Sequence, residues 1–398
     1  MRCLADPEIA YQTICKAISC GINHLETARG YGQSETYLGL ALQRVSDKSR
    51  ISPQAPKSGG TGIESPPDLG DLGGVRVVDC TFQTPSQREL PVDRSQLYIT
   101  TKLSPTPDRA LMAKWIDESL ERLQLDYIDC LAIHGINTPE HLDWVQDGCY
   151  PAIAEAIESG KIRHVGFSTH GSLELILAAI ETKLFEFINL HYYYFYQRLA
   201  PAIELASKYD MGIFIISPAD KGGRLYTPPP NLVELCAPLT PLAFNYRWLL
   251  ADDRISTLSL GAANPDQLYP SLDVADDNDP LTRMEMEIID RLERQLQTSL
   301  NNDLCNQCYA CLPCPAQINI PEVLRLRNLA IGYEMTDYGQ YRYQMFENAG
   351  HWFPGMKANR CNECGDCLPR CPQELNIPQL LADAHHKLHT RQGRRLWD

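Results

Sequence analysis

The 398-residue sequence contains no run of about 18 consecutive apolar residues, so we expect no membrane-spanning helix. Its first ten residues, MRCLADPEIA, lack the apolar stretch of a secretory signal, and we therefore do not expect secretion. Basic residues are also scarce: 36 lysines and arginines stand against 50 aspartates and glutamates, a net charge of −14. Nucleic-acid binding requires a basic surface and is not expected.

Two cofactor motifs are absent as well. No G-x-G-x-x-G sequence follows any candidate strand, which argues against a Rossmann dinucleotide site, and no flavin motif is found. General disorder is excluded because hydrophobic residues make up 44% and charged residues 22% of the chain, as in ordinary globular proteins. Residues 301–398 contain ten basic and ten acidic residues, so the negative charge lies entirely before residue 301.

Strand-like and helix-like segments alternate between residues 6 and 264. The candidate strands are 21–28, 97–103, 126–135, 162–170, 187–194, 211–219 and 255–263. The candidate helices are Glu8–Ser19, Ser34–Val45, Asp108–Leu123, Pro151–Ser159, Ser172–Thr182, Leu199–Tyr209 and Leu239–Leu250. Repeated strand-then-helix units predict a parallel sheet, and seven of them favour an α/β fold of the (β/α)8 TIM-barrel type over an open sheet.

One strand is missing from this pattern, because the chain begins in a helix and only seven strands are visible. The first strand of the barrel is therefore expected upstream of Met1, in which case a longer chain should melt at a higher temperature. Two alternatives are that VRVVDCTF (75–82) or a partner chain fills the gap. Residues 46–95, rich in proline, glycine and serine, are predicted to be a flexible insertion around that segment.

The last third of the chain has a different organisation. Residues 277–300 carry leucine, isoleucine and methionine at helical spacing and predict an acidic connecting helix. An internal repeat follows, in which CNQCYACLPCPAQINIPEVL (305–324) aligns with CNECGDCLPRCPQELNIPQLL (361–381). A helix is expected over 321–331. The predicted domains are thus 1–276, the connecting helix 277–300, and a small, mainly helical domain at 301–398.

Each copy of the repeat carries four cysteines and ends in Cys-Pro. The candidate metal ligands are Cys305, Cys308, Cys311, Cys314, Cys361, Cys364, Cys367 and Cys371. The second run, C-x2-C-x2-C-x3-C-P, has the spacing of two-cluster ferredoxins, in which the fourth cysteine binds the other cluster. Two 4Fe–4S clusters are predicted. A zinc ribbon, which needs only four ligands, and a single cluster are the alternatives.

The other seven of the 15 cysteines are scattered and odd in number, which argues against a disulfide framework. This pattern is typical of a reducing compartment, and we expect a cytoplasmic location.

Polar side chains with complementary chemistry stand where three consecutive strands end. Glu26 and Tyr31 follow the first of them, Lys102 ends the second and His134 ends the third. The active residues of parallel barrels lie at these strand ends. A lysine ammonium beside a tyrosine stabilises the phenolate, a carboxylate orients the lysine, and a histidine can hydrogen-bond a carbonyl oxygen. The set suits carbonyl reduction.

With these residues in place, residues 6–270 resemble the aldo-keto reductase family. GINHLETARGYGQSE is similar to the family's carboxylate and tyrosine segment, LYITTK to its lysine strand, and DYIDCLAIHG to its histidine strand. The resemblance implies that Glu26, Tyr31, Lys102 and His134 form the catalytic tetrad, and that NADPH or NADH is the cofactor. The residues it places along that cofactor are Ser168, Thr169, Ser217, Lys221, Gly222, Arg224, Gly261, Ala262, Asn264 and Gln267.

The chain departs from the family pattern in places. Glu26 stands where aspartate is usual, Ile216 where many members stack an aromatic ring, and the adenine-side segment lacks the usual arginine and lysine. That last feature leaves NADP and NAD both open. His24, His164 and His170 are interpreted as structural groups or groups at the barrel rim, and Tyr193 or Tyr194 as possible pocket residues.

These observations predict an oxidoreductase that reduces a small carbonyl compound by hydride transfer and carries an α-helical two-cluster domain. The clusters would exchange single electrons with a ferredoxin- or flavin-type partner. Hydride transfer moves two electrons, so the two activities need a coupling step. An alternative is a nicotinamide-binding redox sensor with little catalysis. Purely structural clusters are a third interpretation.

Overall fold

Seven parallel strands run in chain order through the first two thirds of the molecule. The computed structural model describes residues 6–46 and 93–390. The strands are β1 His24–Glu26, β2 Tyr98–Leu103, β3 Ile128–His134, β4 Ile162–Ser168, β5 Phe187–Leu190, β6 Gly212–Ile216 and β7 Thr257–Ser259. They pair in the order β1 to β7, each parallel to the next. The predicted strand-and-helix barrel is confirmed, with every strand inside its expected segment.

The pairing register brings the carboxyl ends of the strands to one face. Glu26 pairs with Thr100, Lys102 with Ala132, and His134 with Ser168. Strands β2 and β3 are buried along nearly their whole length, because helices cover one side and the barrel interior the other. Both strands nevertheless carry buried polar residues, which are Thr100, Thr101 and Lys102 in β2 and Asp129 in β3.

Strands β1 and β7 are the two edges of the sheet in the part of the chain that the structure describes, and no backbone pairing joins them. A side-chain contact nevertheless spans the gap, because the Ser259 hydroxyl donates to the Glu26 carboxylate. The barrel is therefore nearly closed. VRVVDCTF, an alternative to an upstream first strand at this position, lies outside the described residues.

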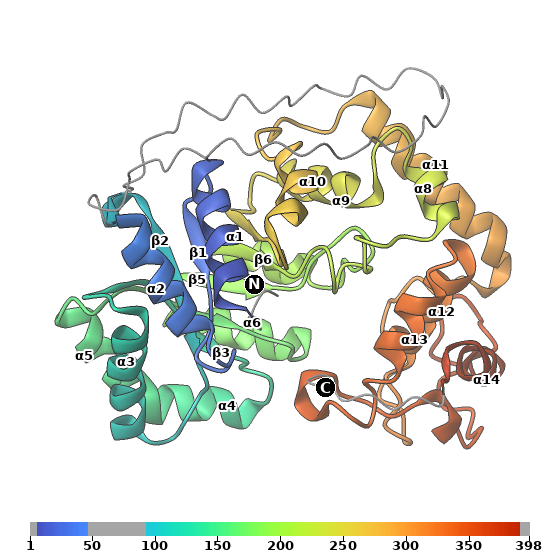
Figure 1. The fold of residues 1–398 in the computed structure, drawn as a ribbon. Helices are drawn as coiled ribbons and strands as arrows, with labels where there is room; N and C mark the ends of the chain where they lie inside the picture. Colours follow the sequence, from blue (N-terminus) through green and yellow to red (C-terminus); the bar gives the residue numbers. More distant parts are fainter. Residues whose placement is uncertain (1–5, 47–92, 391–398) are drawn as a thin grey trace, which may run out of the picture.

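Helices surround the sheet (Figure 1). They are α1 Pro7–Ser19, α2 Ser34–Ser46, α3 Arg109–Leu123, α4 Pro139–Trp144, α5 Tyr150–Glu158, α6 Leu173–Glu181, α7 Ala200–Lys208, α8 Pro230–Cys236, α9 Pro241–Leu250 and α10 Tyr269–Leu272. Several begin at a side-chain cap: Asp6, Asp108 and Ser172 each accept a hydrogen bond from a backbone N–H of the first turn. The sequence places such a residue before each of these helices, which explains why their predicted starts are accurate.

The connecting helix is shorter than predicted. Helix α11 spans Arg283–Leu300, whereas the sequence interpretation began it at residue 277. Thr282 caps the helix, and Glu285 returns a hydrogen bond to the backbone of Thr282, completing a capping box. The cap fixes the start, so Leu281 lies before the helix. Ile288 and Leu292 are buried as the helical spacing predicted.

Three helices form the C-terminal module, drawn in orange to red beside the barrel in Figure 1. They are α12 Ile320–Gly332, α13 Thr336–Tyr343 and α14 Ile377–Leu388. The sequence repeat recurs as a structural repeat, because α12 and α14 each follow a cysteine run and begin at Asn-Ile-Pro. Proline in the first turn starts a helix without losing a hydrogen bond. The helix expected over 321–331 is confirmed as α12.

The module is not a separate body, since it shares a hydrophobic core with the barrel. Leu232 and Phe244, from α8 and α9, belong to the same buried cluster as Ile288, Val323 and Leu381. A buried ion pair between Arg247 and Glu285, 2.7 Å apart, ties α9 to α11. None of the helices within residues 6–46 and 93–390 is both long and apolar enough to cross a membrane.

Candidate active site and cysteine centre

The loop after β1 carries the candidate tyrosine. The backbone of this loop continues the pairing with β2, because Thr27 N–H donates to Thr100 O and Arg29 N–H to Lys102 O. A tight turn follows, closed by the bond from Tyr31 N–H to Ala28 O and eased by the positive φ of Gly32. Tyr31 therefore returns over the strand ends, and its side chain is 36% exposed.

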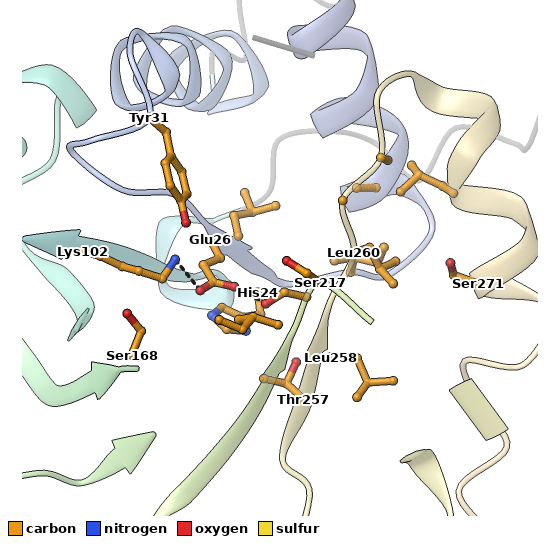
Figure 2. Close-up of a pocket in the computed structure, with 18 of the residues that line it drawn as sticks. His24, Glu26, Tyr31, Lys102, Ser168, Ser217, Thr257, Leu258, Leu260 and Ser271 are labelled. Atoms are coloured by element: carbon orange, nitrogen blue, oxygen red, sulfur yellow. Dashed lines mark hydrogen bonds and ion pairs between the residues drawn. The ribbon is translucent and has the colours of Figure 1, made fainter. Parts of the chain in front are cut away.

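Lysine and glutamate form a buried ion pair beneath this tyrosine. Lys102 Nζ lies 2.5 Å from Glu26 Oε1 and also donates to the backbone oxygen of Thr27 at 3.1 Å. Figure 2 shows Tyr31 pointing toward this pair. The ammonium lies 5.3 Å from the centre of the Tyr31 ring. The glutamate in place of the family's usual aspartate thus still reaches the lysine.

The charges of the pair stabilise one another. Burial alone would raise the pKa of Glu26, but the attraction of Lys102 outweighs it and lowers that pKa from 4.5 to about 2. Burial likewise opposes the charge on Lys102, yet Glu26 raises the lysine pKa above its ordinary value. At neutral pH the lysine is therefore an ammonium held against a carboxylate.

His134 completes the group on the other side of Tyr31. The two rings meet edge to face, with centres 5.4 Å apart. Burial lowers the pKa of His134 to about 3, assisted by the positive charges of Lys102 and Lys221. The imidazole is neutral at physiological pH, and one ring nitrogen carries a proton that it can donate to a ligand.

A cavity of about 630 Å³ opens at these four side chains. All four of the predicted tetrad residues line it, so the structure brings together what the sequence placed on three strands. Two further groups, which the sequence interpretation missed, hold the carboxylate: Asn189 donates to Glu26 at 2.8 Å and Ser259 donates to its other oxygen. Asn189 is a polar residue inside the buried strand β5, which is the one signal that could have found it.

Glu26→Gln should expose how much of the site depends on this ion pair. Removing one partner of a buried pair leaves the other charge uncompensated and costs about 3–5 kcal/mol. We expect a lower melting temperature and weakened carbonyl reduction. Because the folded pKa of Glu26 is depressed, its stabilising contribution is complete above pH 4.5 and is lost as the pH falls toward 2.

Thermal melts between pH 3 and pH 7 measure this contribution. The wild type should lose stability relative to Glu26→Gln over the acidic part of that range. Glu8→Gln is the matched control, since Glu8 pairs with Arg44 on the surface and should matter by less than about 1 kcal/mol. Equal melting curves for wild type and Glu26→Gln at pH 7 would contradict the assignment.

The ten predicted cofactor residues divide into two groups. Five line the cavity beside the predicted tetrad: Ser168, Ser217, Lys221, Gly261 and Ala262. The other five do not line it: Thr169, Gly222, Arg224, Asn264 and Gln267. Figure 2 shows Ser168 close to Lys102 and Ser217 on the side of β7. The cavity thus extends from the four predicted tetrad residues toward the segment after β7.

Local structure explains why the second group lies elsewhere. Thr169 donates to Ile136 O, Asn264 accepts from Gln267 N–H, and Gln267 accepts from Ala263 N–H. A Cβ on Gly222 would collide with Pro218 O, so this glycine serves the turn. Arg224 is exposed and stacks on the ring of Tyr341 in the C-terminal module, 4.4 Å from its centre.

The C-terminal module contributes a residue to the barrel mouth that the sequence interpretation did not include. Trp352 lies edge to face against His134 and His170, with ring centres 5.6 and 5.3 Å apart. The contact is close, because a Cβ on Gly135 would meet the indole at 2.6 Å. Nothing in the sequence signals these contacts, since they join residues more than 180 positions apart.

The cysteines of the two runs interleave in space. One small cavity is lined by Cys314 together with three cysteines of the second run, Cys361, Cys364 and Cys367. The remaining cysteine of the second run, Cys371, lies near the first run. Burial raises the pKa of Cys305, and the neighbouring thiols Cys308 and Cys371 raise it further.

Burial also raises the pKa of Cys311 to about 12, with Cys305, Cys308 and Cys367 adding to the effect. The backbone N–H of Gln307 donates to the Cys305 sulfur at 3.4 Å, a contact that would stabilise a thiolate. Within residues 6–46 and 93–390, no three histidine, cysteine, aspartate or glutamate side chains are arranged to hold a single metal ion.

Comparison with known proteins agrees with the division into a barrel and a C-terminal cysteine module. The sequence model of the aldo/keto reductase family matches residues 86–294, more than half of the chain, and that of the 4Fe-4S dicluster domain matches residues 304–375. An aldo-keto reductase of Mycolicibacterium smegmatis is 26% identical over 206 residues, which are 51% of this chain and 69% of that protein. L-galactose dehydrogenase of Arabidopsis thaliana is 36% identical over 86 residues, 20% of this chain and only 27% of the plant protein.

Solved structures share the barrel. The holo form of an aldo-keto reductase from Bacillus halodurans matches with a TM-score of 0.53 at 20% identity, over 73% of this chain and 90% of that one. An aldo/keto reductase from Klebsiella pneumoniae, in complex with NADP and acetate, matches with a TM-score of 0.51 at 16% identity, over 72% and 86%. At this identity the matches show the fold alone.

The family match begins beyond Glu26 and Tyr31, so those two positions rest on the geometry described above. The predicted family and the predicted iron–sulfur domain are both confirmed. The chain belongs to the aldo/keto reductase family of oxidoreductases and carries a 4Fe-4S dicluster domain at its C-terminal end.

Proposed function

We propose that the protein reduces the carbonyl group of a small molecule, with a nicotinamide dinucleotide as hydride donor. The observation that carries this proposal is the convergence of Tyr31, Lys102 and His134 on one cavity, with Glu26 beneath them. A neutral imidazole and a tyrosine hydroxyl are both hydrogen-bond donors, and a carbonyl oxygen that gains negative charge needs such donors.

Each residue has a distinct role in this reaction. Tyr31 donates its hydroxyl proton to the carbonyl oxygen as the carbonyl carbon accepts a hydride, and an alcohol results. The Lys102 ammonium stabilises the phenolate left on Tyr31, and Glu26 keeps that ammonium charged and in place. His134 donates a hydrogen bond that orients the carbonyl. Proton transfer of this kind contributes about 10²–10⁴-fold to rate.

The residues along the cavity fit a dinucleotide. Ser168 and Ser217 offer hydroxyls near the tetrad, and Gly261 and Ala262 leave the far end open. There the Ser271 hydroxyl is buried without a hydrogen-bond partner in the described part of the chain, as expected of a group that awaits a ligand. The Klebsiella pneumoniae enzyme of this fold was solved with NADP, and NADPH or NADH would supply the hydride here.

The cysteine module fits two 4Fe–4S clusters with crossed ligand sets. Cys314, Cys361, Cys364 and Cys367 would hold one cluster, and Cys305, Cys308, Cys311 and Cys371 the other. A cubane cluster is wider than one ion, so its cysteine ligands stand farther apart than those of a zinc ion. The clusters would pass single electrons to or from a ferredoxin- or flavin-type partner.

Turnover by anaerobically purified protein tests the proposed function. We expect consumption of NADPH or NADH with simple aldehydes, one equivalent per equivalent of alcohol formed. Electron paramagnetic resonance before and after NADPH addition reports whether the nicotinamide reduces the clusters. If no aldehyde or ketone is reduced by protein that binds the nicotinamide, the catalytic proposal is wrong and the redox-sensor interpretation takes its place.

A further inference from the structure

A second cavity, of about 990 Å³, lies between the barrel mouth and the C-terminal module. The barrel contributes His170, His191 and Lys221 to its lining, and the module contributes Arg342 and Trp352. His170, Lys221 and Trp352 line the catalytic cavity as well. The two cavities therefore meet at these side chains, next to the tetrad.

Lys221 lies in this cavity without a carboxylate partner. Its ammonium nitrogen is 3.4 Å from Nε2 of both His170 and His191, and these two nitrogens are 3.2 Å apart. Burial lowers the pKa of both histidines well below 6.5, so neither carries a charge at neutral pH. Asp220 attracts Lys221, but Lys221 forms no ion pair with a carboxylate in the described part of the chain.

Arg342 is the second cation. Its side chain is 8% exposed, and its guanidinium lies over the ring of Phe353, 4.3 Å from the ring centre. Within the described residues its side chain donates one hydrogen bond, to the sulfur of Met345, which is a weak acceptor, and its Nε has no hydrogen-bond partner there. Burial of an unpaired charge is costly, so such cations normally have an anion beside them.

The carboxylates around the cavity do not supply that anion. Each of the three that line it faces another arginine: Glu322 pairs with Arg325, Glu347 pairs with Arg360, and Glu174 lies within electrostatic range of Arg198. Arg342 therefore carries a positive charge that no carboxylate lining the cavity balances. Burial, together with repulsion by Arg342, lowers the pKa of Lys221 to about 7, so Lys221 adds part of a second positive charge at neutral pH, and an anion bound beside it would favour its charged form.

We propose that this second cavity binds the carboxylate or phosphate group of the carbonyl substrate, held by Lys221 and Arg342. The inference rests on the proposed function, since the tetrad must hold the carbonyl end of the same molecule. The cavities meet at His170, Lys221 and Trp352, so one small molecule can reach both. The substrate class is then an aldehyde or ketone that also carries an acidic group.

Direct binding tests the site without requiring catalysis. Titration calorimetry with succinate and with inorganic phosphate would be performed on the full chain with its clusters. Arg342→Gln should weaken binding by about tenfold or more, the loss of a charge-assisted contact. Lys221→Met provides a second test if Arg342→Gln does not fold. Lys208→Met, which removes an exposed lysine paired with Glu204, is the matched control and should bind as the wild type does.

Substrate discrimination is the second measurement. The ratio of kcat/KM for 4-oxobutanoate to that for butanal, which differ in the carboxylate, should exceed one and fall about tenfold in Arg342→Gln but not in Lys208→Met. If the wild-type protein binds the anions but reduces neither carbonyl compound, the proposed function is overturned and the anion site is not. The anion site itself would be overturned if the wild type bound neither anion, or if Arg342→Gln and Lys221→Met both bound the anions as tightly as the wild type does.

The anionic group bound by Lys221 and Arg342 could instead be the phosphate of a cofactor. Flavin mononucleotide is therefore titrated in parallel. Flavin binding that depends on Arg342, with no binding of succinate, would assign the cavity to a cofactor and refute its role in substrate recognition.

Discussion

Replacement of Tyr31 by phenylalanine should lower kcat for carbonyl reduction by about 10²–10⁴-fold while nicotinamide binding stays nearly unchanged. The phenylalanine ring keeps the edge-to-face contact with His134, so the shape of the cavity is preserved. Only the hydroxyl is lost, and this group acts when the carbonyl oxygen gains charge in the transition state. The effect therefore falls on kcat rather than on the affinity for the dinucleotide.

Steady-state rates and nicotinamide fluorescence titration measure the two quantities. Tyr98→Phe is the matched control, because Tyr98 begins β2 at the opposite end of the barrel and is 52% exposed. Wild-type turnover by Tyr31→Phe would show that the tetrad assignment is wrong. A parallel loss of nicotinamide affinity would place Tyr31 in binding instead of proton transfer.

The barrel could be predicted well because its signals are local. Apolar runs bounded by turns gave all seven strands, and capping residues such as Asp108 gave the helix starts. The tetrad was predictable for a related reason: parallel strands bring their carboxyl ends together, so residues at those ends must converge. Glu26 and Lys102 are 76 positions apart, yet the strand order alone brings them into contact.

Features that depend on packing between distant segments could not be predicted. Ser259 reaches Glu26 only because β1 and β7 approach one another across an unpaired edge. Trp352 reaches His134 because the module shares a core with α8 and α9, which no periodicity reports. Helix α13 was missed because it is rich in tyrosine and lacks a clear apolar spacing.

The cysteine spacing is that of two-cluster ferredoxins, in which the fourth cysteine of a run binds the other cluster, and the position of Cys314 supports the proposed crossed ligation. Cys314 belongs to the first run by sequence but shares its cavity with Cys361, Cys364 and Cys367. We expect the proline after the fourth cysteine of each run to help turn that cysteine away from the other three. With two clusters of four irons, anaerobically prepared protein should contain about eight irons per chain.

Paired serine substitutions should distinguish crossed ligation from ligation within each run by iron content. Under crossed ligation, Cys314→Ser and Cys364→Ser damage the same cluster, so the double variant should keep about four irons, like each single variant. Cys314→Ser combined with Cys371→Ser should lose both clusters, although both are fourth cysteines of their runs. The module should then unfold more readily than the barrel, because bound metal contributes directly to folding free energy.

Iron and sulfide analysis with electron paramagnetic resonance gives the measurement, and Cys20→Ser, an exposed cysteine of the barrel, is the control. If each run instead ligated its own cluster, the double variant Cys314→Ser/Cys364→Ser would lose both clusters. The double variant Cys314→Ser/Cys371→Ser would lose both clusters under either arrangement. The decisive result is therefore the double variant Cys314→Ser/Cys364→Ser. Retention of about four irons requires that a cysteine of the first run serve the cluster of the second, and loss of nearly all iron would refute the crossed assignment.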